Sequence, residues 1–346
     1  MSARGGQPVE ARGRRPRSRA WRRFRGNRAA RVSGWFLAGA VVLLVVTLPF
    51  SWAWFNVQDV QHAIRAAPTT GQVVSYTVYE QPLRDHAAGR YASAAGPVMH
   101  KASAWFGYDN VGRSLLYRCL FGWLVSLSIG LAAAGLAVTI GVVWGTLAAM
   151  AGGRVDLVMM RIVDMLFGLP YILLVIVLKT GLETPLTRLF GDRAQAANVV
   201  ILFLAIGGVS WLTMARVIRG QVLSLREQPF IEAARAGGIG RFRILWRHLL
   251  PNLIGPIVVY ATLAVPQAIL QESFLSFLGI GVQAPIPSLG RLAADGVAAV
   301  NTFVGFWWLI TFPCLILVLT LLALNFLGDG LRDALDPKSS AATMVS

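Results

Sequence analysis

The sequence predicts an all-α, polytopic membrane protein with six transmembrane helices. Hydrophobic residues make up 55% of the 346 residues and charged residues 14%, against about a quarter in ordinary soluble domains. The mean hydropathy is +0.60. Several uncharged runs reach the length of about 20 residues that a helix needs to cross a bilayer. These observations exclude a soluble domain built around one large core.

The first predicted element is a basic tail followed by an apolar span. Residues 1–32 contain eleven arginines and one glutamate, whereas residues 33–55 are uncharged. The uncharged run is too long for the apolar region of a signal peptide, so we expect a retained first transmembrane helix at 33–55. Arginines beside a span favour the cytoplasmic side and contact anionic lipids. Nothing else in the chain supports nucleic-acid binding, and we expect no such partner.

A long polar segment, 56–119, separates the first span from the second. We expect it to be an extracytoplasmic insertion that leads into span two. Apolar and polar residues alternate at 71–79, a pattern that is compatible with a pair of strands.

Five further apolar runs complete the predicted bundle, which we expect to occupy 120–328. These runs are 120–153, 162–178, 196–215, 253–271 and 303–327. A polar loop at 226–252 lies between two of them, and residues 329–346 form a short tail. With the N-terminus inside, 22 lysines and arginines fall in inner segments and 10 in outer segments. This bias predicts that both termini and the 226–252 loop are cytoplasmic.

The 226–252 loop has the pattern of two short helices joined by a turn. Residues 229–235 are rich in good helix formers, and Gly237-Gly238 then permits a chain reversal. Residues 241–250 resume a helical pattern, with Phe242, Leu245 and Leu249 on one stripe and Arg243 and Arg247 elsewhere. We therefore expect a helix–turn–helix bracket held between two spans. An ordinary amphipathic loop helix fits the same pattern, whereas a DNA-binding motif is disfavoured because both ends join membrane spans.

Known catalytic and metal-binding signatures are absent from the sequence. No Gly-x-x-x-x-Gly-Lys-Ser/Thr phosphate loop occurs, so any ATP must be hydrolysed on another polypeptide. Cys119 and Cys314 lie far apart in apolar surroundings and suggest buried small side chains, not a metal site. We therefore expect no catalytic residue, no metal and no cofactor bound by this chain.

Polar residues near the outer end of the fifth span are candidates for lining a pathway. Gln267, Gln271 and Glu272 lie there, and the two glutamines are four residues apart, on one side of a helix. Hydrogen bonds between helices are an alternative for the glutamines, and pairing with Arg291 is an alternative for Glu272. Asp164, in the third apolar run, is expected to pair with Arg161 or Arg154.

Motifs in order along 107–338 resemble a known family of membrane proteins. The segments that carry the resemblance are Gly107–Arg113, 152–164, Glu232-Ala233-Ala234 with Gly238 and His248–Pro251, Glu272–Gly279, and Gly328–Pro337. This pattern resembles the dipeptide/oligopeptide/nickel class of ABC importer permeases, and in particular its second, C-type permease. Ser114 stands where that family usually has aspartate, and the insertion at 56–104 is longer than is typical.

The resemblance implies a type I importer permease fold that imports peptides or a related small solute. It implies a second permease subunit as heterodimer partner, two ABC ATPase subunits that hold ATP and magnesium, and an extracytoplasmic solute-binding protein. The residues it assigns to ATPase coupling are Glu232, Ala233, Ala234, Gly238, Leu250 and Pro251. The implied location is the bacterial inner membrane. The alternatives are a secondary transporter driven by an ion gradient, which should show inverted repeats and paired intramembrane acids, and a non-transporting membrane scaffold.

Overall fold

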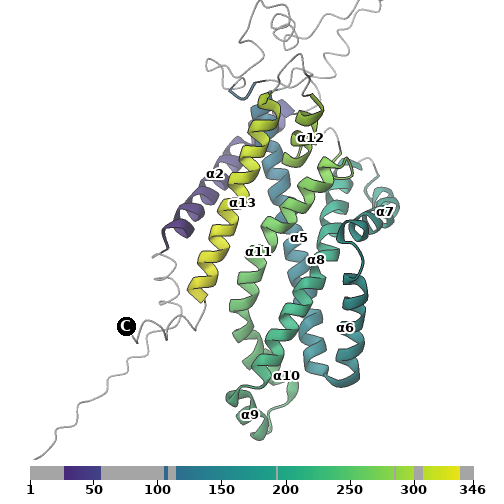
Figure 1. Ribbon diagram of the computed structural model, residues 1–346, viewed down its shortest axis with the longest axis vertical. Helices are drawn as coiled ribbons and strands as arrows, with labels where there is room; N and C mark the ends of the chain where they lie inside the picture. Colours follow the sequence, from purple (N-terminus) through teal and green to yellow (C-terminus); the bar gives the residue numbers. More distant parts are fainter. Residues whose placement is uncertain are drawn as a thin grey trace, which may run out of the picture.

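The computed structural model describes residues 27–55, 105–107, 114–191, 194–283, 286–299 and 307–335. The long helices run roughly side by side in one elongated bundle (Figure 1). In chain order the elements are α2 (Arg28–Phe55), α5 (Leu115–Ala151), α6 (Gly153–Phe167), α7 (Tyr171–Phe190), α8 (Ala194–Arg226), α9 (Pro229–Ala236), α10 (Arg241–Ile244), the π-helical turn η3 (Leu245–Leu249), α11 (Leu250–Phe277), α12 (Leu289–Ala299) and α13 (Trp307–Leu335).

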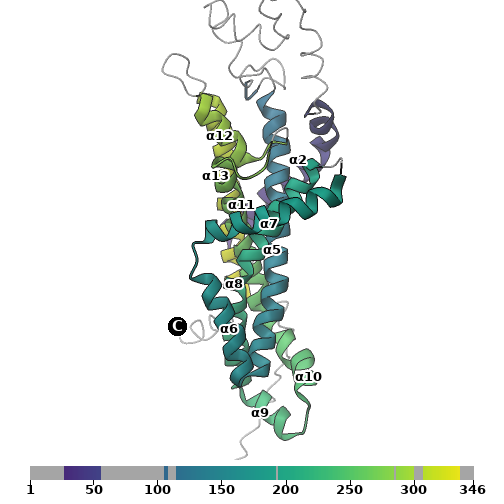
Figure 2. The same cartoon turned by 90° about the vertical axis from the view of Figure 1, so that its right-hand side faces the viewer.

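The described residues contain five helices that are long and apolar enough to cross a membrane, and a bent pair that makes a sixth if it is counted as one span. The bent pair is α6 and α7, whose axes differ by 97°, and α7 turns across the bundle (Figure 2). The apolar run predicted at 162–178 is therefore broken between α6 and α7, and the predicted count of six spans holds when the bent pair is one span. Gly168-Leu169-Pro170 ends α6 because proline lacks an N–H and disfavours helical geometry in the residue before it.

The remaining predicted spans are confirmed, but several of their predicted boundaries are not. The boundary drawn between 119 and 120 falls inside α5, and the boundary drawn between 328 and 329 falls inside α13. Both helices continue past their uncharged runs into residues such as Arg118 and Arg332. Hydropathy marks the part of a helix that lipid can cover, whereas backbone hydrogen bonding sets where the helix ends. The basic tail before residue 27 and the strand pair expected at 71–79 lie outside the described residues.

Helices α5 and α8 form the central contact of the bundle, and glycines allow their close approach. A Cβ added at Gly141 would lie 2.5 Å from Met214 Cβ, and one added at Gly145 would lie 2.4 Å from the Ala215 carbonyl oxygen. In a bilayer, association of helices depends on such close packing because lipid is as apolar as the side chains. The two helices therefore form a fixed frame for the rest of the bundle.

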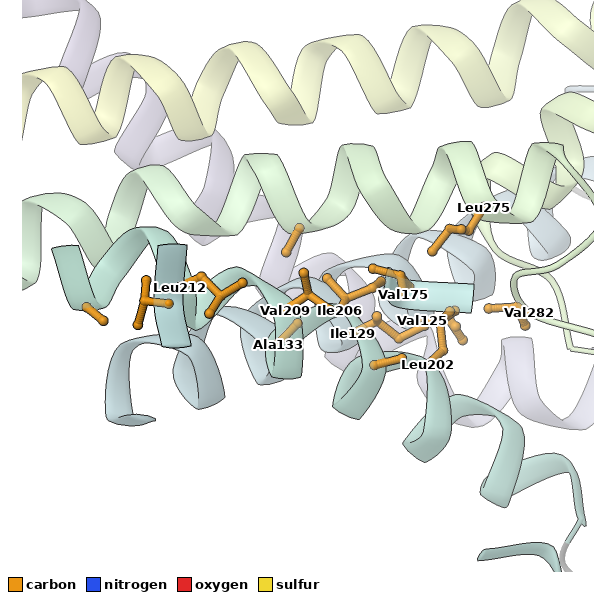
Figure 3. Packing of buried hydrophobic residues seen from close by; sticks show 14 of the residues in the cluster. Val125, Ile129, Ala133, Val175, Leu202, Ile206, Val209, Leu212, Leu275 and Val282 are labelled. Carbon is orange, nitrogen blue, oxygen red and sulfur yellow. The ribbon is translucent and has the colours of Figure 1, made fainter. Parts of the chain in front are cut away.

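Around this frame, side chains from α5, α7, α8 and α11 build the largest buried cluster. Figure 3 shows Ile129, Val175, Ile206 and Leu275 pointing into it from these four helices. Helix α2 packs against α13 and α5, and in Figure 1 it lies along the outer side of α13. Helices α9 and α10 lie at one end of the bundle and α12 at the other. The short helices α9, α10 and α12 thus lie at the ends of the long apolar helices.

Candidate functional site: a bracket and two cavities

The loop between α8 and α11 folds as the predicted bracket, which we define as residues 229–251. Its first helix, α9, confirms the helix expected at 229–235, with Pro229 at its start. Ile231 is fully buried and packs with Ile218 and Val222 of α8. Glu232, the next residue along the helix, is exposed. One face of α9 is thus locked to the membrane helices, and the other presents a carboxylate.

The alanines of the bracket do not share one surface. Ala233 is exposed, whereas Ala234 is buried beside Ile231 and packs into the same cluster. Of the two alanines that the resemblance assigns to ATPase coupling, only Ala233 is therefore exposed in this structure. Ala234 follows Ile231 by three residues and therefore lies on the same, buried face of the helix, whereas Ala233 points away from that face.

The turn that follows α9 depends on Gly238. Its φ is +76°, which is the left-handed geometry expected from glycine at this point. The Gly237 N–H donates to the Ala233 carbonyl at 2.9 Å, and the Ile239 N–H donates to the Ala234 carbonyl at 3.1 Å. These bonds satisfy the end of α9 and reverse the chain.

The second arm of the bracket differs in part from the prediction. Residues 241–250 are helical, but 245–249 form a π-helical turn that leads directly into α11, with Pro251 in its first turn. Leu249 is buried as expected, whereas Phe242 is 74% exposed and contacts Trp246, which is 60% exposed. The wider turn changes which side chains share a face, so Ile244 replaces Phe242 in the buried stripe. Leu250 is half-buried, and Pro251 is exposed.

A charged cavity lies between α6 and α8. Its volume is about 650 Å³, and the charged side chains that line it are Asp156, Arg161, Asp164, Arg216 and Arg219. Arg219 donates to both carboxylate oxygens of Asp156 at 2.6 Å, and Arg216 donates to Asp164 at 2.7 Å. The expected partners of Asp164, Arg161 and Arg154, are therefore wrong. Helix α8 provides the guanidinium groups because it packs beside α6, a proximity that the sequence order alone does not show.

A second cavity opens at the break between α6 and α7, and we call it the neutral cavity. Its volume is about 390 Å³, and Tyr171, Ser210, Tyr260, Gln267 and Gln271 are among its polar lining residues. Both glutamines thus line this cavity. Phe167 also lines it, and the Arg216 guanidinium lies 3.8 Å from the centre of that ring. Arg216 itself lines the charged cavity, so Phe167 separates the two.

Glu272 lines neither cavity. Its side chain has no exposed surface, and its carboxylate accepts hydrogen bonds from Ser126 at 2.9 Å and Ser276 at 2.7 Å. Arg291, its proposed partner, instead donates to Asp295 at 3.0 Å. In this structure Glu272 is therefore a buried hydrogen-bond acceptor that lies away from both cavities. A residue next to Gln271 along a helix faces about 100° away from it, here into the bundle.

Sequence reasoning also missed functional candidates that the fold brings together. Tyr171 and Ser210 join Gln271 in the neutral cavity, although they come from three different helices. Gly168-Leu169-Pro170 inside an apolar run was a usable signal, because a break in a span exposes polar side chains and backbone to a cavity. No comparable signal marks Ser210, whose neighbours in sequence are apolar.

Comparison with known proteins identifies the family. Residues 141–341 match the family model described as "Binding-protein-dependent transport system inner membrane component". The chain belongs to this family. Residues 15–68 also match the model for the N-terminal transmembrane domain of oligopeptide transport permease C. This second match covers part of the basic tail and the whole first span, which confirms the resemblance to the C-type permeases.

Curated relatives agree with this assignment. The chain is 44% identical to the oligopeptide transport system permease protein OppC of Haemophilus influenzae, over 71% of this chain and 73% of that protein. It is 41% identical to OppC of Salmonella typhimurium, over 96% and 94%. Identity to the dipeptide transport system permease protein DppC of Bacillus subtilis is 42%, over 74% and 75%.

The fold is that of an ABC importer permease. A chain of the inward-facing MetNI methionine ABC transporter matches with a TM-score of 0.50 and 20% identity, covering 64% of this chain and 98% of that chain. At that identity the likeness concerns the fold alone. Together with the family match, it makes this permease a multi-pass inner-membrane subunit of an ABC importer. A secondary transporter and a non-transporting scaffold are not favoured.

Proposed function

We propose that the chain is the C-type permease of a peptide importer and that a separate ATPase drives it through the bracket. The observation that carries the mechanical part is the two-sided character of α9. Ile231 is locked into the cluster of α8 and α11, while Glu232 on the other face is exposed. The peptide substrate class is supported by the names of relatives that are 41–46% identical.

The bracket has the mechanical properties of a lever. Force applied to Glu232 and Ala233 would reach the spans through Ile231 and through the continuous helix that joins α10, η3 and α11. A buried cluster transmits such force because close-packed side chains are not compressible. Arg235 and Arg247 are exposed on the same bracket, so the docking partner would present acidic or amide groups to them and basic or amide groups to Glu232.

The proposed assembly contains a second permease, two ATPase subunits and an extracytoplasmic binding protein. ATP and magnesium would be held by the ATPases, and this chain would carry out no chemistry and bind no cofactor. The bracket would be cytoplasmic, with both termini on that side and the basic tail against anionic lipid. Half of the solute pathway would come from this chain, with Gln267 and Gln271 on its surface.

The test is reconstitution of the complete importer in liposomes, with ATP inside and peptide-loaded binding protein outside. Glu232→Arg should abolish ATP-dependent uptake, because the reversed charge repels the groups that recognise a carboxylate. Glu183→Arg makes the same charge change at an exposed position of α7 and should leave uptake intact. Full-rate uptake by the Glu232 variant, or uptake without ATP, would refute the coupling mechanism.

A further inference from the structure

The polar groups of the neutral cavity are arranged around Gln271. The Tyr171 hydroxyl donates to the Gln271 amide oxygen, and the Ser210 hydroxyl lies 3.4 Å from that oxygen and donates to the Ile206 carbonyl at 2.8 Å. These contacts orient the carboxamide with its oxygen toward Tyr171. Its NH₂ group, with two N–H donors, has no hydrogen-bond partner in the described part of the chain.

Gln267 lies one helical turn before Gln271 and lines the same cavity. Its side chain also has no hydrogen-bond partner within the described ranges. Four residues of helix advance about 6 Å along the axis. The chain therefore presents two carboxamide groups at a spacing of about 6 Å, one of them held in a fixed orientation.

This spacing corresponds to the repeat of an extended peptide. Successive residues of an extended chain advance about 3.3 Å, and groups on the same side recur every second residue, at about 6.6 Å. A carboxamide offers both a donor and an acceptor, which complements a main-chain N–H or C=O. Alternate peptide units of an extended chain can therefore meet Gln267 and Gln271 in turn.

The lack of charged side chains in the described lining of the cavity favours the same kind of ligand. None of the described residues that line it carries a charge, and a charged group transferred there without a partner would lose its hydration. Peptide units are neutral, so they lose only their hydrogen bonds to water when they enter the cavity. Hydrogen bonds to the two glutamines replace them. The ion pairs of the charged cavity lie beyond Phe167.

We infer that Gln267 and Gln271 bind main-chain amides of a passing extended peptide, so that the cavity recognises peptide backbone independently of peptide sequence. This inference rests on the proposed peptide import. Tyr171 acts as a positioning residue, because it holds the oxygen of Gln271 and leaves the N–H groups free for the ligand.

The experiment compares two cargoes in the complete reconstituted importer, tetra-alanine and the same peptide N-methylated at its internal amides. The binding protein is saturated with each cargo, so its own affinity does not enter the uptake rate. The wild type should transport the unmethylated peptide about three- to tenfold faster, the effect of one net hydrogen bond. The Gln267→Met/Gln271→Met double variant should reduce this preference to within about twofold. Gln283→Met, outside the cavity, should keep it.

Each result decides between the two proposals. A double variant that retains the wild-type preference, or a wild type that shows none, overturns backbone recognition. A wild type that imports neither peptide overturns peptide import instead. ATPase stimulation by the loaded binding protein reports correct assembly of every variant and should be unchanged. If the double variant fails to assemble, the single variants Gln271→Met and Tyr171→Phe carry the test, and an unaltered preference in both overturns the inference.

Discussion

The Ser126 hydroxyl donates a hydrogen bond of 2.9 Å to the carboxylate of Glu272, across 146 positions of sequence. The same serine oxygen accepts the backbone N–H of Leu289 at 3.1 Å. Ser276 donates to the other carboxylate oxygen and accepts the N–H of Val282 at 3.1 Å. One buried carboxylate thereby connects α5, α11 and the segment that leads into α12, the end of the bundle away from the bracket.

Removing this carboxylate should destabilise the protein strongly. Glu272→Ala leaves the buried hydroxyls of Ser126 and Ser276 without their acceptor, and we expect a loss of about 2–4 kcal/mol. Glu272→Gln keeps one acceptor oxygen and should lose less. Thermal unfolding of the purified protein in detergent measures the difference. Glu183→Ala, at an exposed carboxylate, is the control and should change stability by less than about 0.5 kcal/mol; equal effects at the two positions would contradict a role for the network.

Substitution by alanine should change the stability of the protein differently at two glycines of α5. Gly145→Ala places a Cβ 2.4 Å from the Ala215 carbonyl oxygen, so α5 and α8 must move apart, at a cost of about 1–3 kcal/mol. A Cβ at Gly135 meets nothing within 4 Å, and alanine there should be neutral or stabilising by up to about 1 kcal/mol. The measurement is again thermal unfolding. Two variants of equal stability would show that the α5–α8 contact is looser than described.

Gly238 and Gly240 provide a matched pair in the bracket. Neither would place a Cβ within 4 Å of another group, but φ is +76° at Gly238 and −61° at Gly240. Gly238→Ala should therefore destabilise the turn by about 1–2 kcal/mol, whereas Gly240→Ala should not. Hydrogen–deuterium exchange of peptides covering 229–251 measures local opening. Faster exchange is expected in the Gly238 variant alone, and unchanged exchange there would falsify the strained-turn account.

The ion pair between Arg219 and Asp156 should couple α6 to α8. Both nitrogens that donate lie 2.6 Å from a carboxylate oxygen, and the two side chains are 33% and 13% exposed. A double-mutant cycle with Arg219→Ala and Asp156→Ala should give a coupling energy of about 1 kcal/mol or more. The Arg216–Asp164 pair, whose carboxylate is 55% exposed, should give less because solvent screens it. Additive single effects at Arg219 and Asp156 would mean that the pair does not hold the helices together.

Local signals were sufficient for most of the helices and for the bracket. Long uncharged runs predicted α2, α5, α8, α11 and α13, because a span must satisfy its backbone internally and meet lipid with apolar side chains. The helix at 229–235 and the reversal at Gly238 followed from helix propensity and from the backbone freedom of glycine. Each of these features depends on residues that are close in sequence.

The errors arose where a residue's partner comes from another helix. The sequence points to Arg161 or Arg154 as the partner of Asp164, whereas the structure pairs it with Arg216 of α8. The sequence offers two roles for Glu272, lining a pathway or pairing with Arg291, whereas serines of two helices hydrogen-bond to it. The register of a π-helical turn changed the buried stripe from Phe242 to Ile244.

The amino-acid sequence by itself determined that this protein crosses a membrane, where five of its spans lie and that its polar bracket lies between two of them. The tertiary structure decided which polar side chains meet: Tyr171 with Gln271, Arg219 with Asp156 and Ser126 with Glu272. The physical reason is that hydropathy and propensity act along the chain, whereas a buried hydrogen bond or ion pair depends on how α5, α6, α8 and α11 pack against one another.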